Sequence, residues 1–243
     1  KDTCLVLTTD HGFLLGEHDW WSKNRMPVYD EIARIPLMIA HPDYSEQGGT
    51  RRKALTQSTD IMPTLLDLHD KEIPRDVLGK SLLPLLEDDH AIRDAAIFGY
   101  FGAACNVTDG RYVYHRYPEK LTADGLYEYT LMPTRMTTRF SISELVDATL
   151  ANPFDFSKGV PLLKLKPRAN EAGEAIEVQG MDFADTQTRL YDLHNDPGQT
   201  TPIDDPEIEA RLVAAMTRLM LEADAPPELF ERFDLTHERA AHV

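Results

Sequence analysis

An aspartate and a histidine stand side by side just after a short apolar run near the start of the chain. The run at residues 4–9 predicts a buried strand of a parallel sheet, and Asp10 and His11 follow it. Ligands of open α/β sheets bind beyond the carboxyl ends of the strands, so this is a place for site residues. A carboxylate oxygen and an imidazole nitrogen that converge would suit a divalent metal. For the pair alone, an aspartate turn beside an ordinary histidine is the alternative.

A lysine follows in a loop that carries two adjacent tryptophans, Trp20 and Trp21. The chain has 25 Lys and Arg against 41 Asp and Glu, and its net charge of −16 repels anions. Lys23 near a metal would supply local positive charge, which could bind a tetrahedral oxyanion and stabilise charge on a leaving oxygen. Taken alone, Lys23 is more simply interpreted as a solvated surface residue.

Composition excludes several classes of protein. Apolar residues make up 42% of the 243, enough for a core, but the longest apolar runs, such as residues 35–40, fall far short of the ~20 residues that span a bilayer. The acidic balance and the lack of a basic stripe argue against nucleic acid as a partner. Two cysteines, Cys4 and Cys105, cannot form a disulfide framework and indicate two thiols or, less often, one bridge.

The first hundred residues alternate strand and helix signals, which favours an α/β sheet. A second apolar run at residues 35–40 predicts another buried strand. A helix is expected over residues 60–69 with Asp60 as its N-cap, and a shorter helical run over residues 82–86. We therefore predict an α/β sheet within residues 1–94.

The second half predicts a small antiparallel sheet with a helix packed on it, in a subdomain of residues 95–243. A strand is expected at residues 95–100, a hairpin turn at Asp109-Gly110 and another strand at residues 189–193. Asp205-Pro206 then opens a long helix. Its expected apolar stripe is Ile208, Leu212, Ala215, Met216 and Leu219. Residues 118–180 have no clear pattern and are expected to be an irregular insertion.

The order of these motifs resembles the C-terminal half of the sulfatase family, within the alkaline phosphatase superfamily. The resemblance rests on an ordered set that covers most of the chain except about 118–180: Thr9-Asp10-His11-Gly12, Leu15-Gly16-Glu17-His18, Trp21-x-Lys23, Arg34-Ile35-Pro36-Leu37, Ser58-Thr59-Asp60-Ile61-Met62-Pro63, Gly79-Lys80-Ser81-Leu82, Thr108-Asp109-Gly110-Arg111-Tyr112 and Leu190-Tyr191-Asp192-Leu193. Each piece is moderately specific, and the set in this order is the stronger signal. The resemblance implies that residues 1–94 are the C-terminal part of the α/β catalytic domain of a sulfatase, with an alkaline-phosphatase-like sheet, followed by the small antiparallel sheet and helix of residues 95–243.

The resemblance also implies a metal-dependent sulfuric ester hydrolase that acts on small-molecule or carbohydrate sulfate esters. Asp10 and His11 match the family's second pair of metal ligands, usually around Ca²⁺. Lys23, thirteen residues after Asp10, matches the lysine that holds the sulfate group. His18 lies in the family's Gly-Glu-His loop, where it is either part of the loop structure or a substrate contact.

Part of the family's site has no counterpart in these 243 residues. The family nucleophile is a cysteine or serine in Cys/Ser-x-Pro-x-Arg, oxidised to formylglycine, and neither this motif nor the paired aspartates of the N-terminal metal motif occur. We therefore expect the formylglycine nucleophile in upstream sequence, and this chain alone to be inactive. The compartment cannot be assigned, because an export signal would also lie upstream.

Two alternatives stay open. A phosphonate monoester or phosphodiester hydrolase of the same superfamily would share the Asp-His pair and the lysine, and would favour Mn²⁺ or another transition metal. A non-catalytic binding module that kept the fold is the other. The sequence does not decide whether the protein forms a homo-oligomer.

Overall fold

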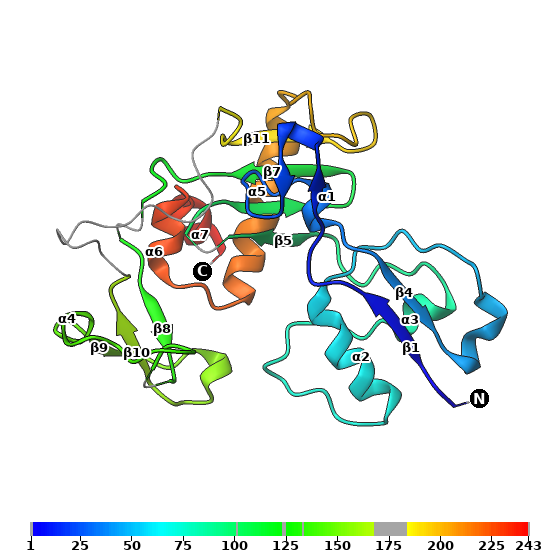
Figure 1. Cartoon of the computed structure of the whole chain (residues 1–243), viewed down its shortest axis with the longest axis horizontal. Helices are drawn as coiled ribbons and strands as arrows, with labels where there is room; N and C mark the ends of the chain where they lie inside the picture. The colour runs from blue at the N-terminus through cyan, green and yellow to red at the C-terminus, as the bar shows by residue number, and fades with distance from the viewer. Residues whose placement is uncertain (1, 101, 123–124, 133, 168–183, 243) are drawn as a thin grey trace.

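A computed structural model describes residues 2–100, 102–122, 125–132, 134–167 and 184–242. Within these ranges the fold mixes helices with four small antiparallel sheets (Figure 1). No helix in the described residues has the length and apolar character needed to cross a membrane. The predicted mixed α/β class is therefore confirmed, while the division into residues 1–94 and 95–243 stays a prediction.

The first strand, β1 (Leu5–Thr8), pairs antiparallel with β4 (Leu37–Ala40). The expected parallel pairing and full burial are wrong for this strand, since Leu5 is 66% and Leu7 58% exposed. An apolar run alone cannot distinguish a parallel strand buried on both faces from an antiparallel strand with one open face. The site residues that follow β1 are nevertheless at its carboxyl end, as the sequence predicts.

The segment that carries Lys23 is a small hairpin followed by a helical turn. Strands β2 (Leu14–Leu15) and β3 (Trp21–Ser22) pair antiparallel around the 3₁₀ turn η1 (Glu17–Asp19), and α1 (Asp30–Ala33) follows. The hairpin reverses the chain, so Lys23 returns toward the residues that precede β2. Burial of Leu14 on this segment fixes the hairpin against the rest of the molecule.

The predicted helix at residues 60–69 is α2 (Ile61–Leu68), preceded by the 3₁₀ turn η3 (Ser58–Asp60). The expected N-cap hydrogen bond from an α2 amide to the Asp60 side chain is absent, because the fully buried Asp60 carboxylate accepts from the guanidinium of Arg93 instead. A further 3₁₀ turn, η2 (Pro42–Gln47), and the short helix α3 (Leu83–Glu87) complete this part of the chain.

A four-stranded antiparallel sheet in the order β11-β7-β6-β5 forms the centre of the second half. Its strands are β5 (Ala96–Gly99), β6 (Cys105–Thr108), β7 (Tyr112–Arg116) and β11 (Arg189–Asp192). The predicted hairpin at Asp109-Gly110 is confirmed between β6 and β7, and Gly110 supplies the left-handed φ of +92° that the turn needs. Both cysteines are free thiols, so the alternative of a bridge is excluded.

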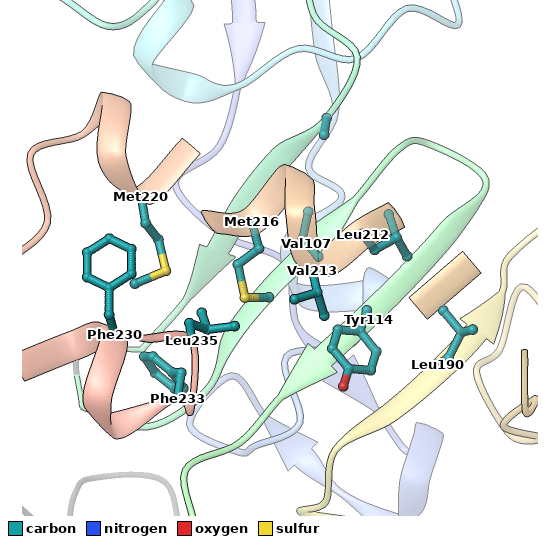
Figure 2. Packing of buried hydrophobic residues seen from close by; sticks show 11 residues of the cluster. Val107, Tyr114, Leu190, Leu212, Val213, Met216, Met220, Phe230, Phe233 and Leu235 are labelled. Atoms are coloured by element: carbon teal, nitrogen blue, oxygen red, sulfur yellow. The ribbon is translucent and has the colours of Figure 1, made fainter. Parts of the chain in front are cut away.

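The long helix α5 (Pro206–Glu222) packs on one face of this sheet, with Asp205 capping its N-terminus. Figure 2 shows Leu212 and Met216 of α5 beside Val107 and Tyr114 of the sheet. Helices α6 (Pro227–Arg232) and α7 (Thr236–His242) follow. The buried core contains Ala95, Val107, Tyr114, Leu190, Leu212, Val213, Met216, Met220, Phe230, Phe233 and Leu235. The predicted helix on an antiparallel sheet is confirmed.

The opposite face of the sheet is covered by the segment that carries the site. Leu14, Val28 and Ile32 form another buried cluster, and Phe98 of β5 and Tyr100, which follows β5, pack against it. This contact joins the Lys23 segment to β5. One face of the four-stranded sheet therefore packs against α5 and the buried core, and the other packs against the segment that carries Lys23.

The expectation that residues 118–180 are irregular is wrong where the structure describes them. They form a three-stranded antiparallel sheet of β8 (Glu128–Thr130), β10 (Leu162–Leu165) and β9 (Thr149–Ala151), with the short helix α4 (Ile142–Leu145) and the 3₁₀ turn η4 (Asp155–Ser157). Strands of three or four residues are too short to show a clear period-two pattern. Residues 123–124, 133 and 168–180 of this expectation lie outside the described residues.

Unfolding should become easier in mild acid because of one buried histidine. His115 in β7 is fully buried, and burial lowers its pKa to about 3 from the ordinary value of 6.5. Below about pH 6.5 the unfolded chain therefore binds a proton that the folded chain does not, and stability falls by up to about 1.4 kcal/mol per pH unit toward pH 3. Urea unfolding from pH 7 to 4 should show a steeper fall of the unfolding free energy in the wild type than in His115→Gln, because the carboxylates contribute equally to both proteins. Equal slopes for the two proteins would contradict the assignment.

Candidate active site

The Asp-His pair lies directly after β1 in an open turn. The Nδ1 of His11 is 2.8 Å from the carbonyl oxygen of Gly12, so Nδ1–H donates and Nε2 keeps its lone pair. The Asp10 Oδ2 lies 3.4 Å from this Nε2. Backbone hydrogen bonds, first from its own amide, outweigh partial desolvation and hold the pKa of the Asp10 carboxyl below its ordinary value. The pair therefore presents an ionised carboxylate and an imidazole lone pair.

Lys23 lies against the same pair. Its Nζ donates to Nε2 of His11 at 2.5 Å, across a separation of twelve residues. Its backbone carbonyl accepts a hydrogen bond of 2.8 Å from the hydroxyl of Tyr100. The structure thus brings together Asp10, His11 and Lys23, the three residues on which the sequence interpretation rests.

A glycine makes this approach possible. The amide of Gly12 donates to the carbonyl of Ile32 at 2.8 Å, so the turn after β1 lies directly on α1. A Cβ at Gly12 would stand 1.8 Å from the carbonyl oxygen of Glu31, closer than atoms can pack. Any side chain at this position would therefore push the Asp-His turn away from the Lys23 segment.

The pair fits part of a metal site. The carboxylate of Asp10 is 81% exposed and the His11 side chain 33%, so both can accept an ion, which would replace the Lys23 ammonium at Nε2. The Nδ1–H bond to a backbone carbonyl is the usual way to orient a metal-binding imidazole. Among the described residues, no group of three or more His, Cys, Asp or Glu side chains could hold a metal. The described chain thus offers two donors of an incomplete set.

His18 lies in the hairpin turn rather than with these three residues. Its ring stacks on Tyr29 at 3.5 Å between centroids and 4° between planes, and its Nε2 lies 3.8 Å from Glu31. The side chain is only 10% exposed. These contacts favour the loop-structure interpretation of His18 over the substrate contact.

An anchor that the sequence does not reveal holds the chain just after Lys23. The guanidinium of Arg25 donates two hydrogen bonds of 2.8 and 3.0 Å to Asp185, and the Tyr29 hydroxyl donates one of 2.6 Å. The side-chain oxygen of Gln199 accepts from the amide of Asp30 at 2.6 Å. Asp185 and Gln199 lie about 155 to 175 residues after the segment that they bind, and neither belongs to a local sequence motif. The charge of Arg25 is the one sequence signal for this anchor, since a buried arginine needs an acidic partner.

A cavity of about 830 Å³ opens beside the pair. Asp10, His11 and Tyr100 line it, and so do the basic side chains Arg34 and Arg111. Its size lies within the usual range for small-molecule sites. Arg34 is paired with Asp30, which also lines the cavity, and Arg111 with Asp192, so their positive charges are partly neutralised.

Comparison with known proteins points to one family. Residues 16–144, more than half of the chain, match the family described as N-sulphoglucosamine sulphohydrolase, C-terminal. An N-acetylglucosamine-6-O-sulfatase of Bacteroides thetaiotaomicron is 39% identical over 104 residues, which are 41% of this chain and 18% of that protein. A multifunctional alkaline phosphatase superfamily protein of Trinickia caryophylli, PehA, is 37% identical over 87 residues, 36% of this chain and 16% of that protein.

A solved structure shares the fold. It superposes with a TM-score of 0.57 over 93% of this chain and 35% of that chain, at 19% identity, and its description is of a protein in complex with its substrate D-glucosamine-2-N,6-O-disulfate. The chain thus spans about a third of the length of this structure, and its match spans less than a fifth of the two relatives. The family match begins at residue 16, inside the Lys23 hairpin, and continues through α2 and the β6–β7 hairpin. Together with the shared fold, it shows that this chain is a C-terminal portion of a member of the sulfatase family, within the alkaline phosphatase superfamily.

Proposed function

We propose that this chain supplies half of the site of a sulfuric ester hydrolase: Asp10 and His11 as ligands of a divalent cation and Lys23 as the group that holds the sulfate. The observation that carries the proposal is the Lys23 ammonium, held 2.5 Å from the imidazole beside an exposed carboxylate. Three residues of the right chemistry converge at a strand end although two of them are twelve residues apart.

Each group has a definite task. Lys23 binds the negative sulfate oxygens and offsets the charge that develops on the leaving oxygen. Asp10 and His11 hold the cation, for which Ca²⁺ fits if the remaining ligands are oxygens. When bound, the cation would neutralise sulfate charge and favour ionisation of the nucleophile. The Gly12 carbonyl keeps the His11 proton on Nδ1 and so leaves Nε2 available.

The nucleophile and the remaining metal ligands are proposed to come from residues beyond these 243. No Cys/Ser-x-Pro-x-Arg motif occurs in the chain, and its described residues offer no third acidic, histidine or cysteine ligand beside the pair. The chain by itself is therefore expected not to turn over substrate. Formylglycine, formed from a cysteine or serine, is the nucleophile that the family resemblance implies.

Carbohydrate sulfate esters are the proposed substrates. One relative is named an N-acetylglucosamine-6-O-sulfatase, and the solved structure with the same fold is described with a disulfated glucosamine. The cavity beside Asp10 and His11 has room for a sugar ring.

A phosphonate monoester or phosphodiester hydrolase is the second candidate, supported by the match to a multifunctional member of the superfamily. Parallel assays of the complete enzyme with 4-nitrophenyl sulfate and with a 4-nitrophenyl phosphonate ester separate the two. We expect the larger kcat/KM for the sulfate, with Ca²⁺ as the supporting metal. Activity on the phosphonate alone, supported by Mn²⁺, would establish the alternative, and no activity on either would favour a binding module.

A further inference from the structure

The position of the Lys23 ammonium depends on a backbone that no regular strand holds. Strand β3 ends at Ser22, so the carbonyl of Lys23 lies beyond the β2–β3 ladder. A lysine ammonium stands at the end of a flexible four-carbon stem. It therefore samples a wide volume unless the backbone of the lysine is fixed. The contact that fixes this carbonyl is the hydrogen bond from the Tyr100 hydroxyl, at 2.8 Å.

Tyr100 is well placed to act as a fixed point. It follows β5, 77 residues from Lys23, and its ring packs against the buried clusters that contain Met26 and Leu14. The same residue lines the cavity that Asp10 and His11 line. The hydroxyl therefore connects the four-stranded sheet to the backbone of the anion-binding lysine, at the edge of the proposed site.

We propose that Tyr100 is a positioning residue for sulfate binding: its hydroxyl holds the Lys23 carbonyl so that the Lys23 ammonium lies over the Asp10–His11 pair. This inference rests on the proposed function. The anchor of Arg25 on Asp185 fixes the chain two residues further on, so the backbone that follows the Lys23 side chain is held at two points by later parts of the chain. Burial raises the pKa of the Tyr100 hydroxyl, so it stays protonated and able to donate at neutral pH.

Tyr100→Phe removes the hydroxyl and keeps the ring, so the packing of the two clusters is preserved. The intact protein is treated with acetic anhydride at increasing concentrations of inorganic sulfate, and acetylation of Lys23 is quantified by mass spectrometry. We expect sulfate to protect Lys23 in the wild type. In Tyr100→Phe the sulfate concentration for half protection should rise about 3- to 10-fold, as expected for one lost hydrogen bond. Tyr44→Phe, a partly buried tyrosine in η2, is the matched control and should match the wild type.

A double-mutant cycle separates positioning from general stability. If Tyr100 acts through Lys23, the Phe substitution should lower kcat/KM for 4-nitrophenyl sulfate in the wild type and have little further effect in Lys23→Ala. The thermal midpoint of Tyr100→Phe should stay near that of Tyr44→Phe. Equal effects in both backgrounds, or protection unchanged in Tyr100→Phe, would overturn the inference and leave the proposed function standing. Absence of sulfate protection in the wild type, with full activity in Lys23→Ala, would overturn both.

Discussion

Replacing Lys23 with alanine should lower kcat for 4-nitrophenyl sulfate in the complete enzyme by about 10²–10³-fold, the usual effect of removing one group that stabilises transition-state charge. The protein is strongly acidic, so the loss of the positive charge nearest the Asp10–His11 pair cannot be compensated by the overall field. The substrate KM should rise as well, since the same ammonium binds the sulfate before reaction. Steady-state kinetics at saturating Ca²⁺ measure both quantities.

A matched control distinguishes this local role from a general charge effect. Lys71→Ala removes the same charge from an exposed loop after α2 and should leave kcat and KM within twofold of the wild type, about 0.4 kcal/mol. Lys23→Arg keeps the charge but changes the geometry of its donors, and should recover only part of the activity. If Lys23→Ala retained wild-type kcat while the control behaved as expected, Lys23 would not be the sulfate-binding group.

Removing the carboxylate of Asp60 should destabilise the chain by about 3–5 kcal/mol, the cost of leaving the partner of a buried ion pair without its counter-charge. Asp60 is fully buried and accepts hydrogen bonds of 2.6 and 2.5 Å from Arg93, whose side chain is 6% exposed. It also accepts from the amides of Gln57 and Lys80. One carboxylate thus connects three segments: the turn η3, the loop at Lys80 that precedes α3, and the loop at Arg93 that precedes β5.

Urea unfolding of Asp60→Ala, monitored by circular dichroism, gives the free energy of unfolding directly. Asp43→Ala serves as the control, because Asp43 is 84% exposed and lies 3.9 Å from His41. It should change the free energy of unfolding by less than about 0.5 kcal/mol. The double variant Asp60→Leu with Arg93→Met should recover only part of the loss, because no unpaired charge remains but the amides of Gln57 and Lys80 still lack their acceptor. A loss below about 1 kcal/mol in Asp60→Ala would contradict the buried-pair assignment.

Elements with a strong local signal could be predicted from the sequence. The Asp109-Gly110 turn and the Asp205-Pro206 start of α5 are encoded by residues within the element itself, and both are confirmed. The pairing direction of β1 and the short strands β8, β9 and β10 could not be predicted, because partner choice depends on residues far away in the sequence. The burial of Asp60 depends in the same way on Arg93.

The candidate site was predictable only in part. Asp10 and His11 are adjacent and end a strand, and Lys23 lies at a fixed spacing along one hairpin, so their chemistry is visible in a short stretch. Tyr100 and Asp185 act on the same segment from 77 and 160 residues away. Each is an ordinary residue in its own surroundings, and only the folded chain places it beside the Lys23 segment.

One carboxylate, one imidazole and one ammonium of this chain are proposed to meet at a single sulfate and cation site. The most direct measurement is an experimental structure of the complete enzyme with Ca²⁺ and inorganic sulfate. We predict a sulfate oxygen within about 3 Å of the Lys23 Nζ, and the cation bound by Asp10 and by Nε2 of His11. Ordered sulfate and Ca²⁺ bound elsewhere, with the Lys23 ammonium in solvent, would contradict the account.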